Sequence, residues 1–226
     1  MVIATSRRGR YLPVMRRVQK CLAGIAVGLL CAAFTASAAR ADTLDSMKKT
    51  YSAINTVEAR FEQTITLSAL KRTREAKGEF YYKRDKGFLW KYTSPKEKAF
   101  LYDGTAIWQE EEDNPVVIRQ KMDKARMEGS LIMDLVEDVT RLDQLFTVKA
   151  STRENNMEVL QLVPRKEGTM QSARIWVDSQ SLIKRLEVIE ITGNVNTIEF
   201  SSIRTNKLLA DTLFVFKAGG KQIEEQ

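Results

Sequence analysis

The chain contains no histidine and only two cysteines. The 226-residue sequence places both cysteines near its start, at Cys21 and Cys31. Without histidine, Ser-His-Asp and Cys-His catalysis, imidazole metal ligands and the commonest general base are excluded. A hydrolase that uses a carboxylate pair stays compatible with the composition, but no Asp or Glu pair stands in a recognisable catalytic motif. We therefore expect a protein that is not an enzyme and that uses no cofactor or metal.

The first 41 residues have the pattern of a secretory signal peptide. A basic segment without acids is followed by an apolar run from Cys21 to Phe34, and Ala-x-Ala patterns end at Ala38 and Ala41. The apolar run is too short to span a bilayer comfortably. We predict that this leader is cleaved near Ala41, before Asp42, and that the chain is exported. The alternative is a membrane anchor that stays uncleaved.

Removal of this leader leaves a neutral chain that lacks cysteine. The leader carries seven of the 36 basic residues and none of the 29 acidic ones, so residues 42–226 contain 29 of each. The net charge of +7 therefore describes the leader, and we expect no binding of nucleic acid. Leu30 stands before Cys31, where a lipidation site needs a small residue. We expect neither a disulfide nor a lipid anchor in the mature chain.

Half of the aromatic residues, nine of eighteen, fall between Gly78 and Trp108. In this segment aromatic and polar residues roughly alternate, and turn residues interrupt the run at short intervals. Such alternation predicts an antiparallel meander with one apolar and one hydrated face. The aromatic face must be covered by other parts of the protein or be offered to an apolar ligand.

Residues 42–226 are expected to form one α+β domain, because no linker, low-complexity tract or long repeat divides them. A first helix is predicted from Asp42 or Thr43, and its apolar face carries Leu44, Met47, Tyr51 and Ile54. A second apolar stripe at helical spacing is formed by Leu131, Ile132, Leu135, Val136, Val139 and Leu142. This second helix either fills an ordinary core or covers a binding site.

The remaining segments predict eleven or twelve strands. They are expected at 57–67, 76–84, 88–92, 97–103, 106–110, 115–121, 145–150, 157–163, 173–178, 182–190, 197–203 and 214–216. About eleven sequential strands can form one strongly curved antiparallel sheet or a sandwich. In the first case the sheet is an unclosed half-barrel, and two or three helices cover its concave face as a lid.

Rings on alternate strand positions and branched aliphatic residues on the second helix suit a fatty acyl chain. Burial of each methylene group contributes about 0.8 kcal/mol. The residues predicted to line an acyl-chain cavity are Met47, Tyr51, Phe61, Phe80, Tyr82, Phe88, Trp90, Leu131, Ile132 and Leu135. Trp108 and Trp176 are interpreted as core anchors instead.

Lys83 and Arg84 close the second predicted strand. For both, the simple interpretation is a charge in a solvated turn. Arg84 stands two and four positions after Tyr82 and Phe80, so in an extended strand its side chain can instead point to the same face as these rings, inward. Its guanidinium would then bond carbonyl groups at a helix end and hold a lid shut.

The order and spacing of several short motifs match one known family. The motifs are Phe61-x-Gln63, Gly78-x-Phe80, Lys83-Arg84, Phe88-x-Trp90, Pro95, Asp103-Gly104, Trp108 and Phe214-x-Phe216. Over roughly residues 44–220 the sequence resembles the periplasmic outer-membrane lipoprotein carriers of Gram-negative bacteria, the LolA-type lipoprotein chaperones. Asp85 stands where this family often has proline.

The resemblance implies a soluble, periplasmic half-barrel whose helical lid covers a hydrophobic cavity. The expected partners are acylated lipoproteins, an inner-membrane ATP-driven transporter that releases them, and an outer-membrane acceptor where one is present. Arg84 falls on the family's lid-locking arginine, and Phe88 on an aromatic position tied to cavity lining and cargo transfer. We expect a monomeric chaperone that carries lipoproteins to the outer membrane. The alternative is a periplasmic lipid-binding or envelope-stress-sensing module of the same half-barrel fold.

Overall fold

The computed structural model describes residues 43–122 and 139–226. They belong to one compact unit of the chain, Arg40–Gln226. The predicted leader lies outside the described residues. So do Leu131, Ile132 and Leu135 of the second apolar stripe.

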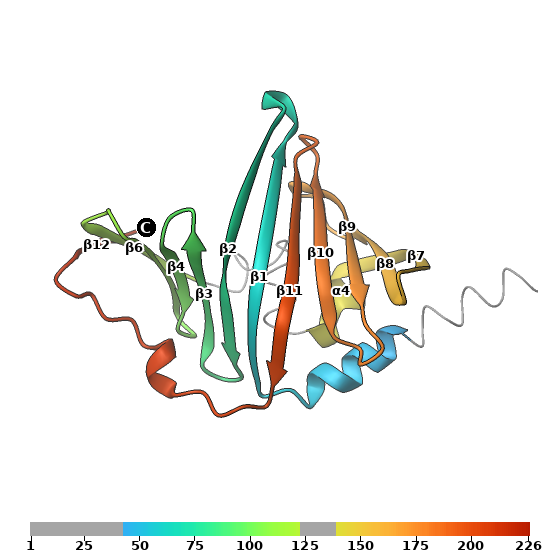
Figure 1. Cartoon of the computed structure of the whole chain (residues 1–226), viewed down its shortest axis with the longest axis horizontal. Helices are drawn as coiled ribbons and strands as arrows, with labels where there is room; N and C mark the ends of the chain where they lie inside the picture. Colours follow the sequence, from blue (N-terminus) through green and yellow to red (C-terminus); the bar gives the residue numbers. More distant parts are fainter. Residues whose placement is uncertain (1–42, 123–138) are drawn as a thin grey trace, which may run out of the picture. The chain divides into compact units, whose positions relative to one another are not determined.

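All twelve strands of the described residues join one curved, unclosed sheet (Figure 1). Their order across the sheet is β12-β6-β5-β4-β3-β2-β1-β11-β10-β9-β8-β7. The strands are β1 (Thr56–Leu67), β2 (Arg72–Lys83), β3 (Gly87–Ser94), β4 (Lys98–Tyr102), β5 (Ala106–Glu111), β6 (Val116–Lys121), β7 (Phe146–Glu154), β8 (Met157–Pro164), β9 (Met170–Val177), β10 (Ile183–Glu190), β11 (Val195–Thr205) and β12 (Gln222–Glu225). Neighbouring strands pair antiparallel except β12, which pairs with β6 in parallel. The predicted curved antiparallel half-barrel is therefore confirmed, and its twelve strands agree with the expected eleven or twelve.

Short helical segments accompany the sheet. The first helix comprises residues 43–52. The others are the 3₁₀ segments η1 (Ser68–Leu70), η2 (Val139–Arg141) and η3 (Asp211–Phe214) and the single-turn helix α4 (Leu142–Leu145). The first helix begins where the sequence predicts it, and its residues Leu44 and Met47 are buried. Lys48 binds Asp143 of α4 at 2.6 Å, which joins the first helix to the segment before β7.

The main core lies between the concave face of the sheet and these helical segments. On β1, Ala59, Phe61 and Gln63 are buried, whereas Arg60 and Glu62 are exposed, as the two-residue period predicts. The core also contains Met47 of the first helix and Val139 and Leu142 of the second stripe. One face of the sheet and both described helical regions thus share one apolar interior.

Gly78 on β2 leaves room for the Phe61 ring because it has no side chain. A side chain at this position would overlap the Lys91 carbonyl oxygen, and its Cβ would lie 2.7 Å from the Phe61 ring. The ring packs against Trp90 at 4.7 Å and against Tyr92 at 5.1 Å. A glycine at this point of the strand therefore allows the aromatic side chains of β1 and β3 to meet across it.

The segment after β11 crosses the opposite, convex face. Leu209 and Phe214 bury against Leu101 of β4, and Phe216 stacks on Trp108 of β5 with ring centroids 4.3 Å apart. The predicted strand at 214–216 is wrong, because these rings pack flat against the sheet instead of pairing with its edge. The chain then reaches the edge six residues later, as β12, a strand that was not predicted. Trp108 belongs to this second core, as expected for an anchor.

Candidate functional site

An apolar cavity of about 300 Å³ lies where the end of the first helix meets the concave face. Five strands, the helix and η2 contribute to its walls. Its lining consists of Tyr51, Ser52, Ile54, Val57, Ala59, Phe80, Tyr82, Arg84, Trp90, Val139, Thr140, Leu182, Ile183, Leu186, Phe200, Ile203 and Thr205. Arg84 is the only one of these residues that carries a charge. The cavity therefore suits an apolar ligand.

Cross-strand pairing brings three of the rings together. Phe80 on β2 pairs directly with Trp90 on β3, and Phe200 reaches both from β11. The ring centroids lie 5.0 Å apart for Phe80–Trp90, 6.2 Å for Phe80–Phe200 and 6.0 Å for Trp90–Phe200. Tilted and edge-on packing at these separations is favourable for aromatic rings, so the three side chains form a well-packed wall of the cavity.

The residues predicted for the cavity divide into three groups. Tyr51, Phe80, Tyr82 and Trp90 line it. Met47, Phe61 and Phe88 are buried in the adjoining core, with exposed fractions of 0%, 1% and 4%. They are not among the lining residues, because the packing of this core encloses them. Leu131, Ile132 and Leu135 lie outside the described residues.

Several lining residues were not predicted, and five of them lie on β10 and β11. Leu186, Phe200 and Ile203 are examples. The alternation in 182–190 and 197–203 marks both segments as strands but does not say which face meets the cavity. The pairing of β1 with β11 also shifts between Glu58 and Arg60, where Ser202 has a positive φ of 52°.

This bulge in β11 reverses the side-chain alternation. Beyond it, Ile203 and Thr205 face the cavity, whereas Arg204 turns outward and binds Glu58 at 2.7 Å. In a regular strand that continued from Phe200, the positively charged Arg204 would face inward. The bulge therefore keeps this side of the cavity apolar.

Arg84 is bonded to the end of the first helix. Its Nε and Nη2 both donate to the Ile54 carbonyl, at 3.2 and 2.6 Å. Nη2 also donates to the carbonyls of Tyr51 and Ser52, at 3.0 and 3.2 Å. Carbonyl groups in the last turn of a helix lack partners within the helix and carry its partial negative charge. The guanidinium binds these carbonyls and connects the end of β2 to the helix at the wall of the cavity.

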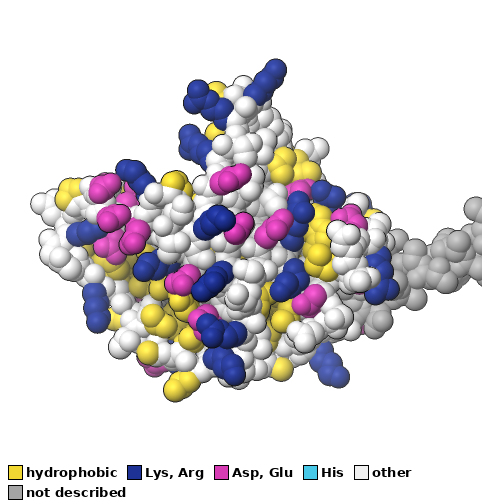
Figure 2. Space-filling model, in the orientation of Figure 1, with side chains coloured by type: hydrophobic (Ala, Val, Ile, Leu, Met, Phe, Trp, Pro, Cys, Tyr) yellow, Lys and Arg dark blue, Asp and Glu magenta, His cyan; other side chains and the backbone are white. Residues whose placement is uncertain are grey.

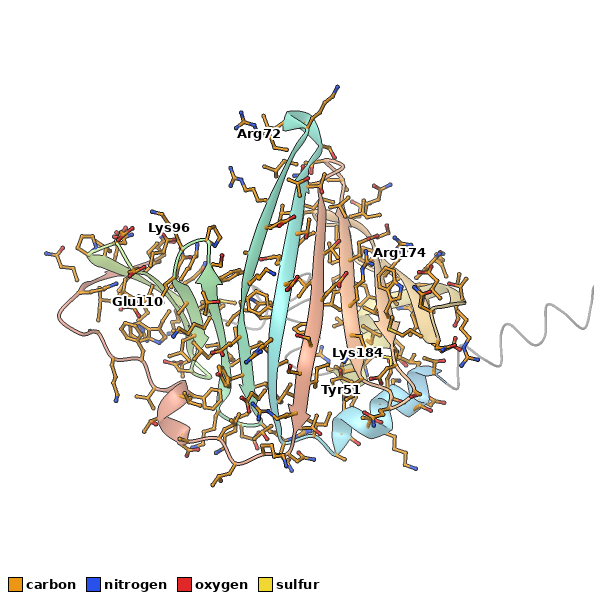
Figure 3. The ribbon with its side chains drawn as sticks, in the orientation of Figure 1. Tyr51, Arg72, Lys96, Glu110, Arg174 and Lys184 are labelled. Carbon is orange, nitrogen blue, oxygen red and sulfur yellow. The ribbon has the colours of Figure 1, made fainter. Side chains whose placement is uncertain are left out.

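Tyr51 attaches the same helix to β10. Its hydroxyl accepts a hydrogen bond from the Ile183 backbone N–H at 3.0 Å. Burial raises the pKa of Tyr51 to about 12, although the hydrogen bond from Ile183 opposes this increase. The phenol therefore stays neutral throughout the physiological range. Figure 3 shows Tyr51 at the foot of the sheet, beside the helix.

The turn after Arg84 explains why Asp85 stands where the family that the sequence resembles often has proline. Asp85 has a φ of 60°, in the left-handed region. Proline is locked near −65° and cannot adopt this conformation. The aspartate in place of proline is thus matched to the turn that Arg84 enters.

Lys83 does not occupy a solvated turn, so that interpretation is wrong. Its Nζ donates to the Leu209 carbonyl at 2.8 Å and binds Asp211 at 2.6 Å. Both partners belong to the segment that crosses the convex face. Lys83 and Arg84 therefore attach the end of β2 to different parts of the chain on its two sides.

A second cavity of about 410 Å³ lies farther along the concave face. Charged residues surround it, including Arg74, Lys98 and Glu111, and Lys98 binds Glu111 at 2.8 Å. Tyr92 and Gln63 also line this second cavity, where the Tyr92 hydroxyl donates to Gln63 at 2.8 Å and Gln63 donates to Asn196 at 2.9 Å. The concave face therefore has an apolar part beside the helix and a polar part beyond it.

The described residues contain no cluster of three or more side chains suited to hold a metal ion. Within 43–122 and 139–226, no helix has both the length and the apolar character needed to cross a bilayer.

Comparison with known proteins gives consistent matches. The family model for "Outer membrane lipoprotein carrier protein LolA" matches residues 52–217. The outer-membrane lipoprotein carrier protein of Methylibium petroleiphilum is 30% identical over 188 residues, covering 82% of this chain and 90% of that protein. The protein of the same name from Methylobacillus flagellatus is 24% identical and covers 78% of this chain and 85% of its own length.

Among solved structures, an uncharacterized conserved protein from Thermus thermophilus superposes with a TM-score of 0.55 at 10% identity. The match covers 83% of this chain and 99% of that one, and it supports the fold alone. The family match, in contrast, extends over most of the described chain and includes Arg84 and every lining residue of the cavity except Tyr51. The chain belongs to the outer membrane lipoprotein carrier protein family.

Proposed function

We propose that this protein is a periplasmic chaperone that binds the acyl chains of lipoproteins and carries them to the outer membrane. The observation that carries the proposal is the apolar cavity beneath a helix that Arg84 bonds to the sheet. An inner-membrane ATP-driven transporter would load the carrier, and an outer-membrane acceptor, where present, would unload it. The carrier itself performs no catalytic step.

The chemistry of the cavity supports this role. Each methylene group moved from water into an apolar wall contributes about 0.8 kcal/mol, so a chain of about sixteen carbons gains on the order of 10 kcal/mol before ordering terms. That gain is enough to keep an acyl chain out of water. It is also small enough for transfer to a more apolar acceptor.

The size of the cavity indicates how loading would proceed. Its volume of about 300 Å³ is at the lower end of the range of about 300–1,000 Å³ typical of ligand sites. A lipoprotein that carries several acyl chains needs more space. We infer that the first helix moves away from the sheet on loading and that its bonds to Arg84 break.

The decisive experiment is mass spectrometry of the protein purified from the periplasm of its own host. Co-purified acylated lipoprotein would support the carrier function. Free phospholipid alone would favour the alternative, a lipid-binding or sensing module of the same fold. Absence of any lipid, with no uptake of acylated peptide by the purified protein, would contradict both.

A variant that fills the cavity tests whether this is the loading site. Thr205 lines the cavity, so Thr205→Trp should reduce the uptake of acylated peptide by about tenfold or more because the indole occupies ligand space. Thr64 is also half-buried but lies on the convex side of β1, so Thr64→Trp serves as the matched control. Equal uptake by the two variants would place the loading site elsewhere.

A further inference from the structure

The β1–β2 hairpin and the β10–β11 turn end side by side at the edge of the sheet farthest from the first helix. The Ser68 backbone N–H donates to Asn194 Oδ1 at 3.1 Å, and the Ser68 hydroxyl donates to the Gly193 carbonyl. These bonds join the two turns into one surface, residues 68–74 and 190–194, which is called the tip below. Figure 1 shows the β1–β2 hairpin projecting beyond the other strands.

The tip exposes two large aliphatic side chains. Leu70 is 61% exposed and Ile191 is 67% exposed. The other exposed large hydrophobic residues of the described chain are Leu208, Val215 and Ile223, all in the segment after β11. A single exposed aliphatic residue is unremarkable, but two on turns that are bonded together form an apolar contact point.

Three exposed cations follow Leu70 in the chain, and the third of them, Arg74, also borders the second cavity. Lys71, Arg72 and Arg74 have no ion pair with any described residue, whereas Lys77, farther down β2, binds Glu62. Residues 68–74 contain no acid, and the next one along the strand is Glu75. Figure 2 shows dark blue side chains on the projecting part of the molecule, with the first magenta ones lower down. Glu190, at the base of the neighbouring turn, accepts hydrogen bonds from Thr192 and Asn194.

We propose that the tip docks on the anionic headgroup surface of a phospholipid membrane. Lys71, Arg72 and Arg74 would contact lipid phosphates, and Leu70 and Ile191 would enter the boundary between headgroups and acyl chains. Basic side chains around an apolar contact are the combination that binds proteins to anionic interfaces. The two short ranges of the tip are smaller than the roughly 20–30 residues that each side of a stable protein interface provides.

Docking through the tip would keep the lid away from the membrane. β1 runs from Thr56, next to the helix that Arg84 binds, to the tip, and twelve extended residues span about 40 Å. Figure 3 shows Arg72 at the tip and Tyr51 at the opposite end of the sheet. The first helix could therefore open while the tip stays on the membrane. This inference concerns the empty protein and holds whether or not the cavity carries lipoprotein.

The test is flotation of the cargo-free protein, purified from the periplasm, with vesicles. One set contains phosphatidylglycerol and phosphatidylcholine, and the other contains phosphatidylcholine alone. We expect binding to the first set only, weakened at high ionic strength because salt screens the exposed charges. Lys71→Gln, Arg72→Gln and Arg74→Gln together should reduce partitioning by about 100-fold, since each cation near an anionic surface contributes about fivefold.

The apolar contribution has its own variants and controls. Leu70→Asn with Ile191→Asn should reduce partitioning by about tenfold or more, whereas Leu208→Asn, at a position 98% exposed after β11, should leave it unchanged. Lys49→Gln, Lys207→Gln and Lys217→Gln remove the same charge from exposed positions away from the tip. Because all these residues are exposed, the variants should remain folded, which circular dichroism checks.

Three results would overturn the proposal. They are equal binding to both kinds of vesicle, equal loss in the tip and control variants, and no binding to vesicles of either kind. Capture of an acidic protein without vesicle binding would also count against it and would assign the tip to a protein partner. Uptake of acylated peptide, measured in the same variants, tests the carrier function separately.

Discussion

Arg84 holds the end of the first helix through a small set of hydrogen bonds. All four join its guanidinium to carbonyl groups of Tyr51, Ser52 and Ile54, at the end of the first helix. Hydrogen bonding by a charged donor contributes a net stabilisation of about 1.5–3 kcal/mol, and the bonds that share Nη2 do not add in full. In the carrier function proposed above, cargo must enter the same space and must overcome this stabilisation of the closed form.

Replacement of Arg84 should therefore favour the loaded protein. Arg84→Leu removes the bonds to the helix, so we expect tighter retention of acylated peptide, by about tenfold or more, and slower transfer to an acceptor. The empty protein should lose about 1–3 kcal/mol of stability in urea unfolding. Loading and release are measured with purified components.

Arg60→Leu is the matched control, because Arg60 is exposed on the opposite face of β1. Arg84→Lys keeps the charge but not the forked geometry and should give an intermediate result. If Arg84→Leu loads and releases cargo at the rates of the unchanged protein, Arg84 does not control the lid.

At the residue scale, sequence could predict Arg84 better than Lys83. The alternation of Phe80 and Tyr82 indicates that Arg84 can point inward, and the structure shows its bonds to a helix end. The partners of Lys83 are Leu209 and Asp211, more than a hundred positions away. No local pattern contains that contact, because the path of the later segment over the convex face determines it.

At the scale of elements, two contacts close to each other attach the end of the first helix to the sheet. Arg84 binds it from β2, and Tyr51 binds β10 through the Ile183 backbone N–H. Burial is the main reason that the pKa of Tyr51 rises from 10.0 to about 12. The folded protein therefore holds the phenol proton more tightly than the unfolded chain does. Stability from this group is complete below about pH 10 and is lost as the pH rises toward 12.

Tyr51→Phe should change the alkaline part of the stability profile. Between pH 10 and 12 the unchanged protein should lose about 2–3 kcal/mol through this group, and Tyr51→Phe should lose less. At neutral pH the variant should be less stable by about 1 kcal/mol, because the Ile183 N–H loses its acceptor.

Thermal unfolding across this pH range provides the measurement, with Tyr81→Phe as the control. Tyr81 lies on the convex face, where desolvation and its hydrogen bond to Glu79 raise its pKa to about 12. Solvent screens this site more than that of Tyr51, so its contribution should be smaller. An alkaline profile of Tyr51→Phe identical to that of the unchanged protein would contradict the assignment.

The elements themselves were largely predictable, but the side of the sheet that each residue faces was not always so. The two-residue alternation of apolar and polar side chains correctly predicts the strands β1, β2 and β3, because each of them has one buried and one hydrated face. The bulge at Ser202 has no such signal. It reverses the alternation of Ile203, Arg204 and Thr205, so part of the cavity wall could not be derived from sequence.

At the scale of the whole domain, the two faces of the sheet have separate roles. The concave face contains the cavity, whereas the segment after β11 covers the convex face and ends as β12 on the edge strand β6. The rings of Phe214 and Phe216 at alternate positions suggested a strand. The same spacing also allows both rings to pack against Leu101 and Trp108. Only the tertiary structure distinguishes a strand from a segment that packs on the sheet.

This separation predicts that the convex covering can be loosened without loss of the lipid site. Phe216→Ala removes the ring that stacks on Trp108 at 4.3 Å, so we expect a loss of about 1–3 kcal/mol of stability and faster hydrogen exchange at the β12 amides. Uptake of acylated peptide should be unchanged, because no residue after Thr205 lines the cavity. The neighbouring residue Val215 is 58% exposed, so Val215→Ala should alter stability by no more than about 0.5 kcal/mol. If Phe216→Ala lowers uptake of acylated peptide while the protein remains folded, the two faces are coupled and the separation proposed here is wrong.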